Sequence, residues 1–147
     1  MTTTARSLTE LYAEVQQFHA AQMQALDSGD FDAYSATFTE DGEFAHTPGR
    51  PAARTRSGIA QELHAYHQER FAQDPVQRRH SFSMLRLSPR TDGAIDATFY
   101  CLVITSRPGV RQPEIAPSCA VHDVLVREKG QLLTRSRRVA HDYLSLL

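Results

Sequence analysis

Apolar residues recur at three- and four-residue steps near the start of the chain, which is the spacing of one face of an α-helix. The members of this stripe are Leu8, Leu11, Tyr12, Val15, Phe18, Ala25 and Leu26. Ser7 or Thr9 can cap the start of the helix, with Glu10 three residues after Ser7 as in a capping box, and Gly29 ends it. The pattern also predicts a short second helix over 31–38 and a third over 57–71.

From about residue 78 the pattern changes to extended segments separated by turns. The predicted strands are 78–89, 94–107, 117–129 and 131–140. Asp92-Gly93 and Lys129-Gly130 are typical of hairpin turns between them. Helices first and strands afterwards predict an α+β fold, with the helices packed on one antiparallel sheet. We expect a single domain over 1–147, because the sequence shows no repeat and no linker.

The composition is that of an ordinary globular domain. The chain has 147 residues, of which 41% are hydrophobic and 22% charged, and its net charge is −1. This balance gives no support for nucleic-acid binding. Three arginines near the end, Arg135, Arg137 and Arg138, lie on a strand-like run, and we interpret them as a solvated face.

Cysteine usage and the N-terminus bear on the compartment. Cys101 and Cys119 fit no metal-ligand spacing, and two thiols in a chain of this size suggest a reducing environment. The first residues lack the apolar core, about 7–15 residues long, of a signal peptide. No window approaches the roughly 20 apolar residues of a membrane span. We therefore expect a cytoplasmic protein that does not bind membranes.

Five segments carry a family resemblance. They are 15–18 (Val-Gln-Gln-Phe), 22–30 (Gln-Met-Gln-Ala-Leu-Asp-Ser-Gly-Asp), 37–44 (Thr-Phe-Thr-Glu-Asp-Gly-Glu-Phe), 78–80 (Arg-Arg-His) and 123–130 (Asp-Val-Leu-Val-Arg-Glu-Lys-Gly). Together they resemble the SnoaL-like branch of the nuclear-transport-factor-two-like superfamily, and within it the small polyketide tailoring proteins of actinorhodin-type pyran-ring pathways. The resemblance implies a cone in which three N-terminal helices and a curved antiparallel sheet enclose one pocket. It also implies a homodimer that pairs through the outer face of the sheet.

The resemblance suggests catalytic roles for His80 and Asp27. Scytalone dehydratase, a more distant relative, has a catalytic His where the third helix passes into the first long strand, and a carboxylate that pairs with it at the end of helix one. A His is well suited to take and return a proton near neutral pH, and a carboxylate would fix its tautomer. Structural alternatives stay open: His80 bonded to a backbone carbonyl, and Asp27 bonded to turn amides.

Five further residues are candidates for substrate binding. His46 falls where ketosteroid isomerase has its general-base Asp and scytalone dehydratase a pocket Tyr, so neither mechanism transfers directly. Gln22 lies near the position of the isomerase's oxyanion Tyr and can donate a hydrogen bond but not a proton. Asp123 matches a pocket Asn of the dehydratase, and a carboxylate on an apolar strand costs free energy unless it is bonded. Tyr34 and Tyr100 can bind an aromatic ligand, with core packing as the alternative.

The sequence shows no phosphate loop, no dinucleotide motif and no set of metal ligands; His64 and His67 lack a carboxylate partner. We therefore expect no cofactor and no metal. The favoured interpretation is a lyase or isomerase of cyclase or dehydratase type that acts on an aromatic polyketide-like substrate by acid–base chemistry. The alternative is a non-catalytic binding or accessory protein, like the dioxygenase small subunits that share this fold.

Overall fold

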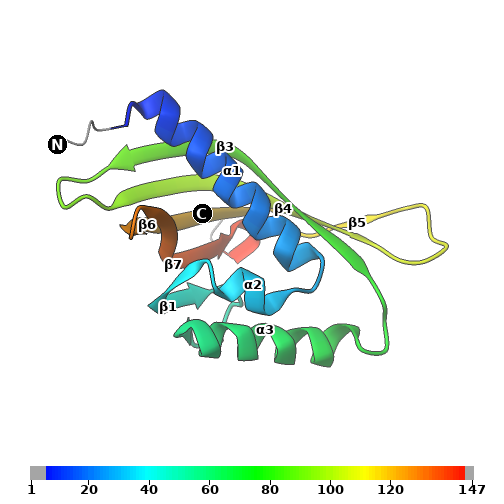
Figure 1. The fold of residues 1–147 in the computed structure, drawn as a ribbon. Helices are drawn as coiled ribbons and strands as arrows, with labels where there is room; N and C mark the ends of the chain where they lie inside the picture. The colour runs from blue at the N-terminus through cyan, green and yellow to red at the C-terminus, as the bar shows by residue number, and fades with distance from the viewer. Residues whose placement is uncertain (1–5, 145–147) are drawn as a thin grey trace.

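Three helices and a seven-stranded sheet make up the computed structural model, which describes residues 6–144 (Figure 1). The helices are α1 (Leu8–Asp27), α2 (Phe31–Ser35) and α3 (Arg56–Phe71). The strands are β1 (Phe38–Ala45), β2 (Ala53–Arg54), β3 (Gln77–Pro89), β4 (Ile95–Ser106), β5 (Glu114–Ile115), β6 (Cys119–Glu128) and β7 (Gln131–His141), followed by a 3-10 turn at Asp142–Leu144. The α+β class predicted from the sequence is confirmed.

Side chains cap all three helices. The Ser7 hydroxyl accepts the Glu10 backbone N–H at 3.1 Å, as the predicted capping box requires. Asp30 accepts the Ala33 N–H at 3.1 Å at the start of α2. Thr55 does the same for Gly58 at the start of α3. Each cap satisfies an N–H that has no partner inside its helix.

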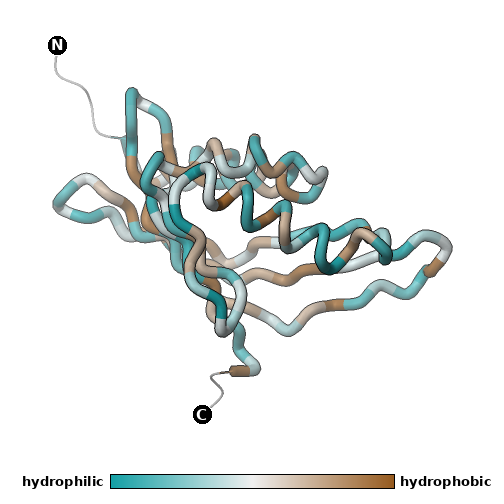
Figure 2. The backbone as a smooth tube through the Cα atoms, turned by 90° about the horizontal axis from the view of Figure 1, so that it is seen from below, coloured by the Kyte–Doolittle hydropathy of each residue, from teal (hydrophilic) through white to brown (hydrophobic). Residues whose placement is uncertain are grey.

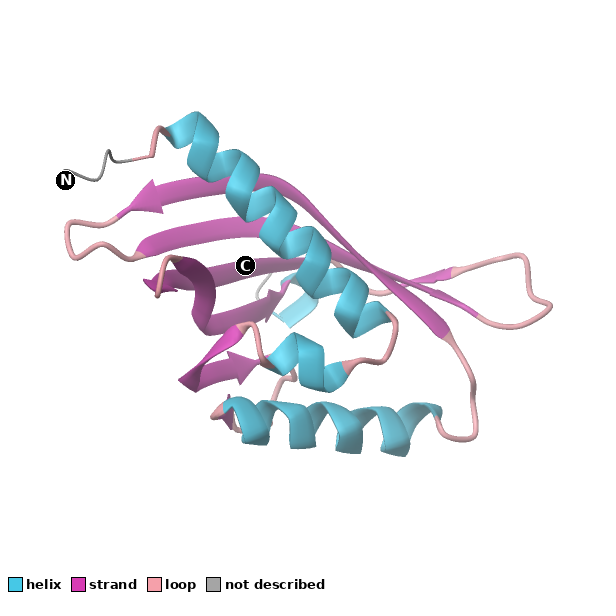
Figure 3. Ribbon diagram, in the orientation of Figure 1, coloured by secondary structure: helices cyan, strands magenta, loops and turns pink. Residues whose placement is uncertain are grey.

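The strand order is β2-β1-β7-β6-β4-β3, with β5 paired to β4. All pairs are antiparallel except β1 with β7, which is parallel, so the predicted antiparallel sheet is a mixed one. No tight turn fixes the direction of β1, because the whole β3–β6 meander separates it from β7 in the chain. Figure 3 shows the long strands bending across the molecule, with α1 lying over one face of the sheet.

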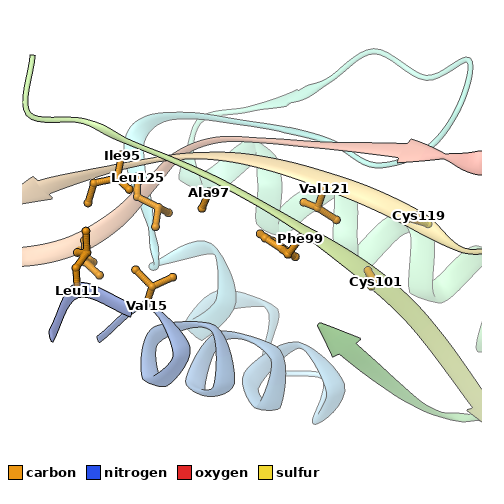
Figure 4. Close-up of a cluster of buried hydrophobic side chains, with 10 residues drawn as sticks. Leu11, Val15, Ile95, Ala97, Phe99, Cys101, Cys119, Val121 and Leu125 are labelled. Atoms are coloured by element: carbon orange, nitrogen blue, oxygen red, sulfur yellow. The ribbon is translucent and has the colours of Figure 1, made fainter. Parts of the chain in front are cut away.

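The core has two parts. In the first, Leu11 and Val15 of α1 pack on Phe99, Val121 and Leu125 of β4 and β6 (Figure 4). The second lies among the helices and β1 and consists of Met23, Phe31, Tyr34, Phe38, Phe44, Ile59 and Leu63. Burying one such side chain contributes about 1.5–3 kcal/mol. The first half of α1 is thus fixed to the sheet, and its second half joins α2 and α3.

Apolar (brown) and polar (teal) stretches are interspersed along the chain, as Figure 2 shows by colour. Burial alternates along the first part of β4, where Phe99 and Cys101 are buried while Tyr100 is exposed. Within residues 6–144, no helix is long and apolar enough to cross a membrane.

Candidate active site

A cavity of about 340 Å³ lies between the helices and the inner face of the sheet. This volume is in the range that holds small organic ligands. Its apolar wall includes Met23, Leu26, Phe44, Leu63, Phe82 and Val103. Its polar wall includes Tyr34, His46, Arg70, Arg78, His80, Arg137 and His141. Three of the seven residues that the sequence predicted for the site, Tyr34, His46 and His80, therefore line it.

Asp27 and His80 form a hydrogen-bonded pair at this wall. Asp27 is the last residue of α1, and its Oδ1 accepts from His80 Nδ1 at 2.6 Å. Its Oδ2 accepts the His80 backbone N–H at 3.1 Å, and Gln77 Nε2 donates to its backbone oxygen at 2.9 Å. The start of β3 is therefore fixed to the end of α1, and His80 is bonded to a carboxylate rather than to a carbonyl.

The pairing determines which nitrogen of His80 faces the cavity. An ionised carboxylate only accepts hydrogen bonds, so Nδ1 carries a proton and donates it. Nε2 is then the acceptor of the neutral ring, and no residue between 6 and 144 forms a hydrogen bond with it. His80 lines the cavity with 15% of its side chain exposed, while Asp27 is 7% exposed. The arrangement presents one free basic nitrogen to a ligand.

A second carboxylate, that of Asp123, lies behind the cavity, and both of its oxygens accept hydrogen bonds from Arg137. Arg137 donates to Asp123 through Nε at 2.8 Å and Nη2 at 2.7 Å. The same guanidinium donates to the Tyr34 hydroxyl at 3.0 Å and to Gln22 Oε1 at 2.7 Å. Burial, the largest single influence, raises the pKa of Asp123, but the charge and hydrogen bonds of Arg137 together with the contact to His19 outweigh it and lower the pKa, so that the carboxyl is ionised at neutral pH.

The interpretation of Arg137 as part of a solvated face is wrong. Arg135 and Arg138 are exposed, but Arg137 is only 2% exposed. The register between β6 and β7 shifts at Arg135: Val124 pairs with Ser136 and Leu125 pairs with Thr134, so Arg135 is left without a partner. Thr134 and Arg137, three residues apart, therefore both face inward. Such a bulge interrupts the two-residue alternation of a strand, so neighbouring arginines on one strand-like run can point to different faces.

Gln22 and Asp123 were predicted to bind substrate, and the structure places both behind the cavity wall. Both are 0% exposed, and neither lines the cavity. Gln22 Nε2 donates to Thr37 Oγ1 at 2.8 Å and to Thr134 Oγ1 at 3.2 Å. Asp123 Oδ2 lies 3.3 Å from His19 Nε2 as well as accepting from Arg137. Asp123 therefore finds its required partners inside the protein, which the sequence could not show.

The two tyrosines lie on opposite sides of the sheet. Tyr34 is 0% exposed and lines the cavity, and burial raises the pKa of its hydroxyl, so it is a neutral phenol. Its oxygen accepts from Arg137, and within residues 6–144 its own proton has no acceptor. Tyr100 is 59% exposed on the outer face of β4 and does not line this cavity. Its neighbours Phe99 and Cys101 occupy the inner face.

His46 faces the cavity as a neutral side chain. It stacks on Phe44 with ring centroids 4.6 Å apart, and its Nδ1 lies 2.9 Å from Thr47 Oγ1. Burial lowers the pKa of His46 to about 4, although the charge of Glu62 opposes this. At neutral pH His46 is therefore better suited to hydrogen bonding than to holding a charge.

Two arginines at the cavity were not identified from the sequence as site residues. The guanidinium carbon of Arg70 lies 4.7 Å from the centre of the Tyr66 ring, and that of Arg78 lies 5.9 Å from it. Both side chains line the cavity, and no carboxylate of residues 6–144 pairs with either. Arg78 lies two residues before His80 on the same strand, so strand alternation alone would have placed both on one face.

No cluster of three or more potential metal ligands is present in the part of the chain that the structure describes. The contacts above instead provide hydrogen-bond donors, one free imidazole nitrogen and two guanidinium groups around an apolar cavity. Such a site can hold an aromatic ligand with oxygen substituents and can exchange a proton with it.

Comparisons with known proteins agree with this architecture. The family model described as "SnoaL-like domain" matches residues 7–138. ActVI-ORFA from Streptomyces coelicolor is 55% identical, with a TM-score of 0.85 over 90% of this chain and 98% of that one. A Catenulispora acidiphila protein whose structure was determined in complex with S-DNPA is 52% identical, with a TM-score of 0.84 over 92% and 96% of the two chains.

A more distant structure is that of Aln2 from a Streptomyces species. It is 34% identical, with a TM-score of 0.85 over 96% of each chain. A search of curated proteins gave no match.

Proposed function

Because the chain belongs to the SnoaL-like domain family, we propose that it is a small tailoring enzyme of aromatic polyketide biosynthesis, of cyclase or dehydratase type. The observation that carries the proposal is the Asp27–His80 pair, which leaves a basic nitrogen at the wall of a ligand-sized cavity. The similarity to ActVI-ORFA and to the protein whose structure was determined in complex with S-DNPA supports the substrate class.

In this proposal His80 moves the proton. Its neutral Nε2 removes a proton from a carbon or hydroxyl of the substrate, and the resulting imidazolium returns it to a departing hydroxyl or to a ring atom. Asp27 holds Nδ1–H and stabilises the imidazolium during this step. General acid–base catalysis of this kind contributes roughly two to four orders of magnitude in rate.

Tyr34 is proposed to bind the substrate oxygen on which negative charge develops. Its hydroxyl accepts from Arg137, which polarises the O–H bond, and no group of residues 6–144 accepts its own proton. A fixed donor that is already held in place costs no reorganisation during the reaction. Gln22 and Asp123 are the buried hydrogen-bond partners of Arg137. They hold the Arg137 guanidinium in position, and the guanidinium in turn holds Tyr34.

Arg70, Arg78 and His46 are proposed to determine where the substrate lies. The two guanidinium groups can bind an acidic substituent of the substrate, because no carboxylate of residues 6–144 pairs with them. His46, neutral and stacked on Phe44, can exchange a hydrogen bond with a carbonyl or hydroxyl. Together with the apolar wall, these groups favour a flat, oxygenated and acidic molecule.

A non-catalytic ligand-binding protein is the second candidate. The observation in its favour is the completeness of the buried network: no buried side-chain nitrogen or oxygen in residues 6–144 lacks a hydrogen bond. Such a network can shape a binding cavity without any chemistry in it.

Deuterium incorporation separates the two candidates. S-DNPA is incubated with the protein in D₂O, its binding is measured by titration, and its mass is followed over time. An enzyme that moves protons should accelerate deuterium uptake into the ligand well above the protein-free rate, and His80→Gln should abolish the acceleration while retaining binding. Tight binding without any acceleration would favour the non-catalytic protein.

We also propose a homodimer that pairs through the outer face of the sheet. Met84, Tyr100 and Leu102 are exposed on this face by 73%, 59% and 41%. Exposed apolar groups gathered in one place are typical of interaction surfaces. Light scattering at micromolar concentration should give twice the monomer mass, and Tyr100→Asp should shift it toward the monomer; a monomeric wild-type protein would contradict the proposal.

A further inference from the structure

Two free cysteines face each other on the cavity wall. Cys101 of β4 and Cys119 of β6 are direct partners in the antiparallel register, and both line the cavity. Figure 4 shows them on neighbouring strands. Residues opposed in this way have Cα atoms about 4.5–5.5 Å apart, which is within the 4.4–6.8 Å range of disulfides. The sheet therefore holds the two thiols where a bond between them needs little movement of the backbone.

His141 is placed to act as a base for one of the two thiols. Its Nε2 lies 2.9 Å from the backbone oxygen of His46, and a carbonyl oxygen can only accept, so this nitrogen carries the proton. Nδ1 of the neutral ring is then an acceptor, and it lies 3.4 Å from Cys119 Sγ. The sulfur also lies 3.5 Å from the Pro117 oxygen, which can accept a hydrogen bond but does not serve as a base.

Cys101 has no comparable base. Its Sγ lies 3.7 Å from the Leu102 oxygen. Burial, with a smaller effect of the nearby Cys119, raises the pKa of Cys101 to about 12. Burial also raises the pKa of Cys119, so its thiolate forms only as its proton passes to an acceptor. The geometry thus separates a thiol that can be activated from one that can resolve an oxidised partner.

We propose that Cys101 and Cys119 form a reversible disulfide on the cavity wall, with His141 as the base and a peroxide as the oxidant. The Cys119 proton passes to His141 Nδ1, and the thiolate attacks one oxygen of the peroxide. The O–O bond breaks, the other oxygen takes the proton from His141, and Cys119 becomes a sulfenic acid. The Cys101 sulfur then attacks the Cys119 sulfur, an S–S bond forms, and the sulfenic hydroxyl leaves as water with the Cys101 proton.

This assignment does not depend on the proposed function, because it uses only the thiols, His141 and an added peroxide. It is tested on the reduced full-length chain with hydrogen peroxide at equimolar concentration. Intact mass measured without reductant should show the loss of two hydrogen atoms per chain, with no thiol left for alkylation and full recovery after dithiothreitol. Gain of oxygen without that loss, or a link between two chains, would overturn the proposal.

Single variants assign the roles of the two sulfurs. In C101S, oxidation should stop at a sulfenic acid on Cys119, which dimedone traps. In C119S, Cys101 should stay reduced under the same conditions, because no base adjoins it. If C119S reacts as fast as C101S, the two thiols are equivalent and the assigned roles are wrong.

His141→Gln tests the base and has a matched control. A Gln can still donate to the His46 oxygen but is not a base. The disulfide should therefore form at least about tenfold more slowly, which is less than the rate enhancement that a general base usually contributes. His122→Asn changes a His on the outer face of the neighbouring strand β6, where Nε2 lies 3.0 Å from Asp96, and should leave the rate unchanged. Equal rates in His141→Gln and wild type, with both proteins folded by circular dichroism, would overturn the role of His141.

Discussion

Two aspartates in this molecule each bind a basic side chain, yet the two pairs differ in what they leave free. Asp27 holds one nitrogen of His80, and the other nitrogen faces the cavity. Asp123 holds Arg137, whose remaining donors are directed to Tyr34 and Gln22. The Asp27–His80 pair retains a free group for chemistry, whereas the Asp123–Arg137 pair is committed to structure.

The comparison also separates two energetic regimes. Asp123 and Arg137 are both nearly inaccessible to water, so loss of either partner leaves a buried charge without compensation. Asp27 and His80 lie at the edge of the cavity, where a ligand or water can replace a lost hydrogen bond. We therefore expect substitutions in the Asp27–His80 pair to affect activity and substitutions in the Asp123–Arg137 pair to affect folding.

The largest expected effect is on turnover, from His80→Ala. If His80 transfers the proton, the rate should fall by roughly two to four orders of magnitude, with the free energy of unfolding changed by no more than about 1 kcal/mol. Product formation and urea denaturation measure the two quantities. Suppose instead that His80→Ala unfolds the protein and that His46→Ala is stable but inactive. The roles of the two histidines would then be reversed.

Arg137→Met should cause the largest loss of stability. It leaves the Asp123 carboxylate buried without its guanidinium partner, which typically costs about 3–5 kcal/mol. Urea denaturation measures the loss, and Arg138→Met, at the exposed neighbouring position, should stay within about 0.5 kcal/mol of wild type. A loss below about 1 kcal/mol for Arg137→Met would mean that water reaches Asp123, and the contrast between the two pairs would disappear.

The pH dependence of stability tests the burial of His46. Its pKa is about 4 in the folded protein and about 6.5 when unfolded, so the unfolded chain binds the extra proton between these values. The stability is complete above about pH 6.5 and is lost as the pH falls toward 4, by about 3 kcal/mol from this group. Urea denaturation at several pH values should show a smaller loss in His46→Gln. Burial also lowers the pKa of His19, so His19 adds to the loss of stability at low pH in the wild type and in His46→Gln alike. Equal pH profiles would contradict the prediction.

Asp27→Asn should reduce turnover less than His80→Ala does. The amide can still meet Nδ1 but does not stabilise the imidazolium, so we expect a loss of about ten- to a hundredfold. The double variant should be no slower than His80→Ala alone, because Asp27 acts through the imidazole. Steady-state rates of the three variants measure this cycle. Additive losses would show that Asp27 has a role of its own.

The sequence predicted what local patterns determine. The α1 stripe, the capping residue Ser7 and the four long strands each depend on neighbours in the chain, and all are present. The His80–Asp27 contact was reached through family resemblance. The inward position of Arg137 depends on a bulge between β6 and β7, which no local pattern marks. The parallel pairing of β1 likewise depends on distant segments.

The smallest expected effect is on ligand affinity, when one hydroxyl group is removed from each of the two tyrosines in turn. Tyr34→Phe removes the donor that lines the cavity and the acceptor of an Arg137 N–H, so the Kd for S-DNPA should rise by about fivefold, corresponding to about 1 kcal/mol for one hydrogen bond. Tyr100→Phe alters only the outer face of β4, so the Kd should stay within about twofold. Fluorescence titration of both variants checks the difference. If Tyr100→Phe weakens binding as much as Tyr34→Phe does, the ligand contacts the outer face of the sheet, and the cavity is not the binding site.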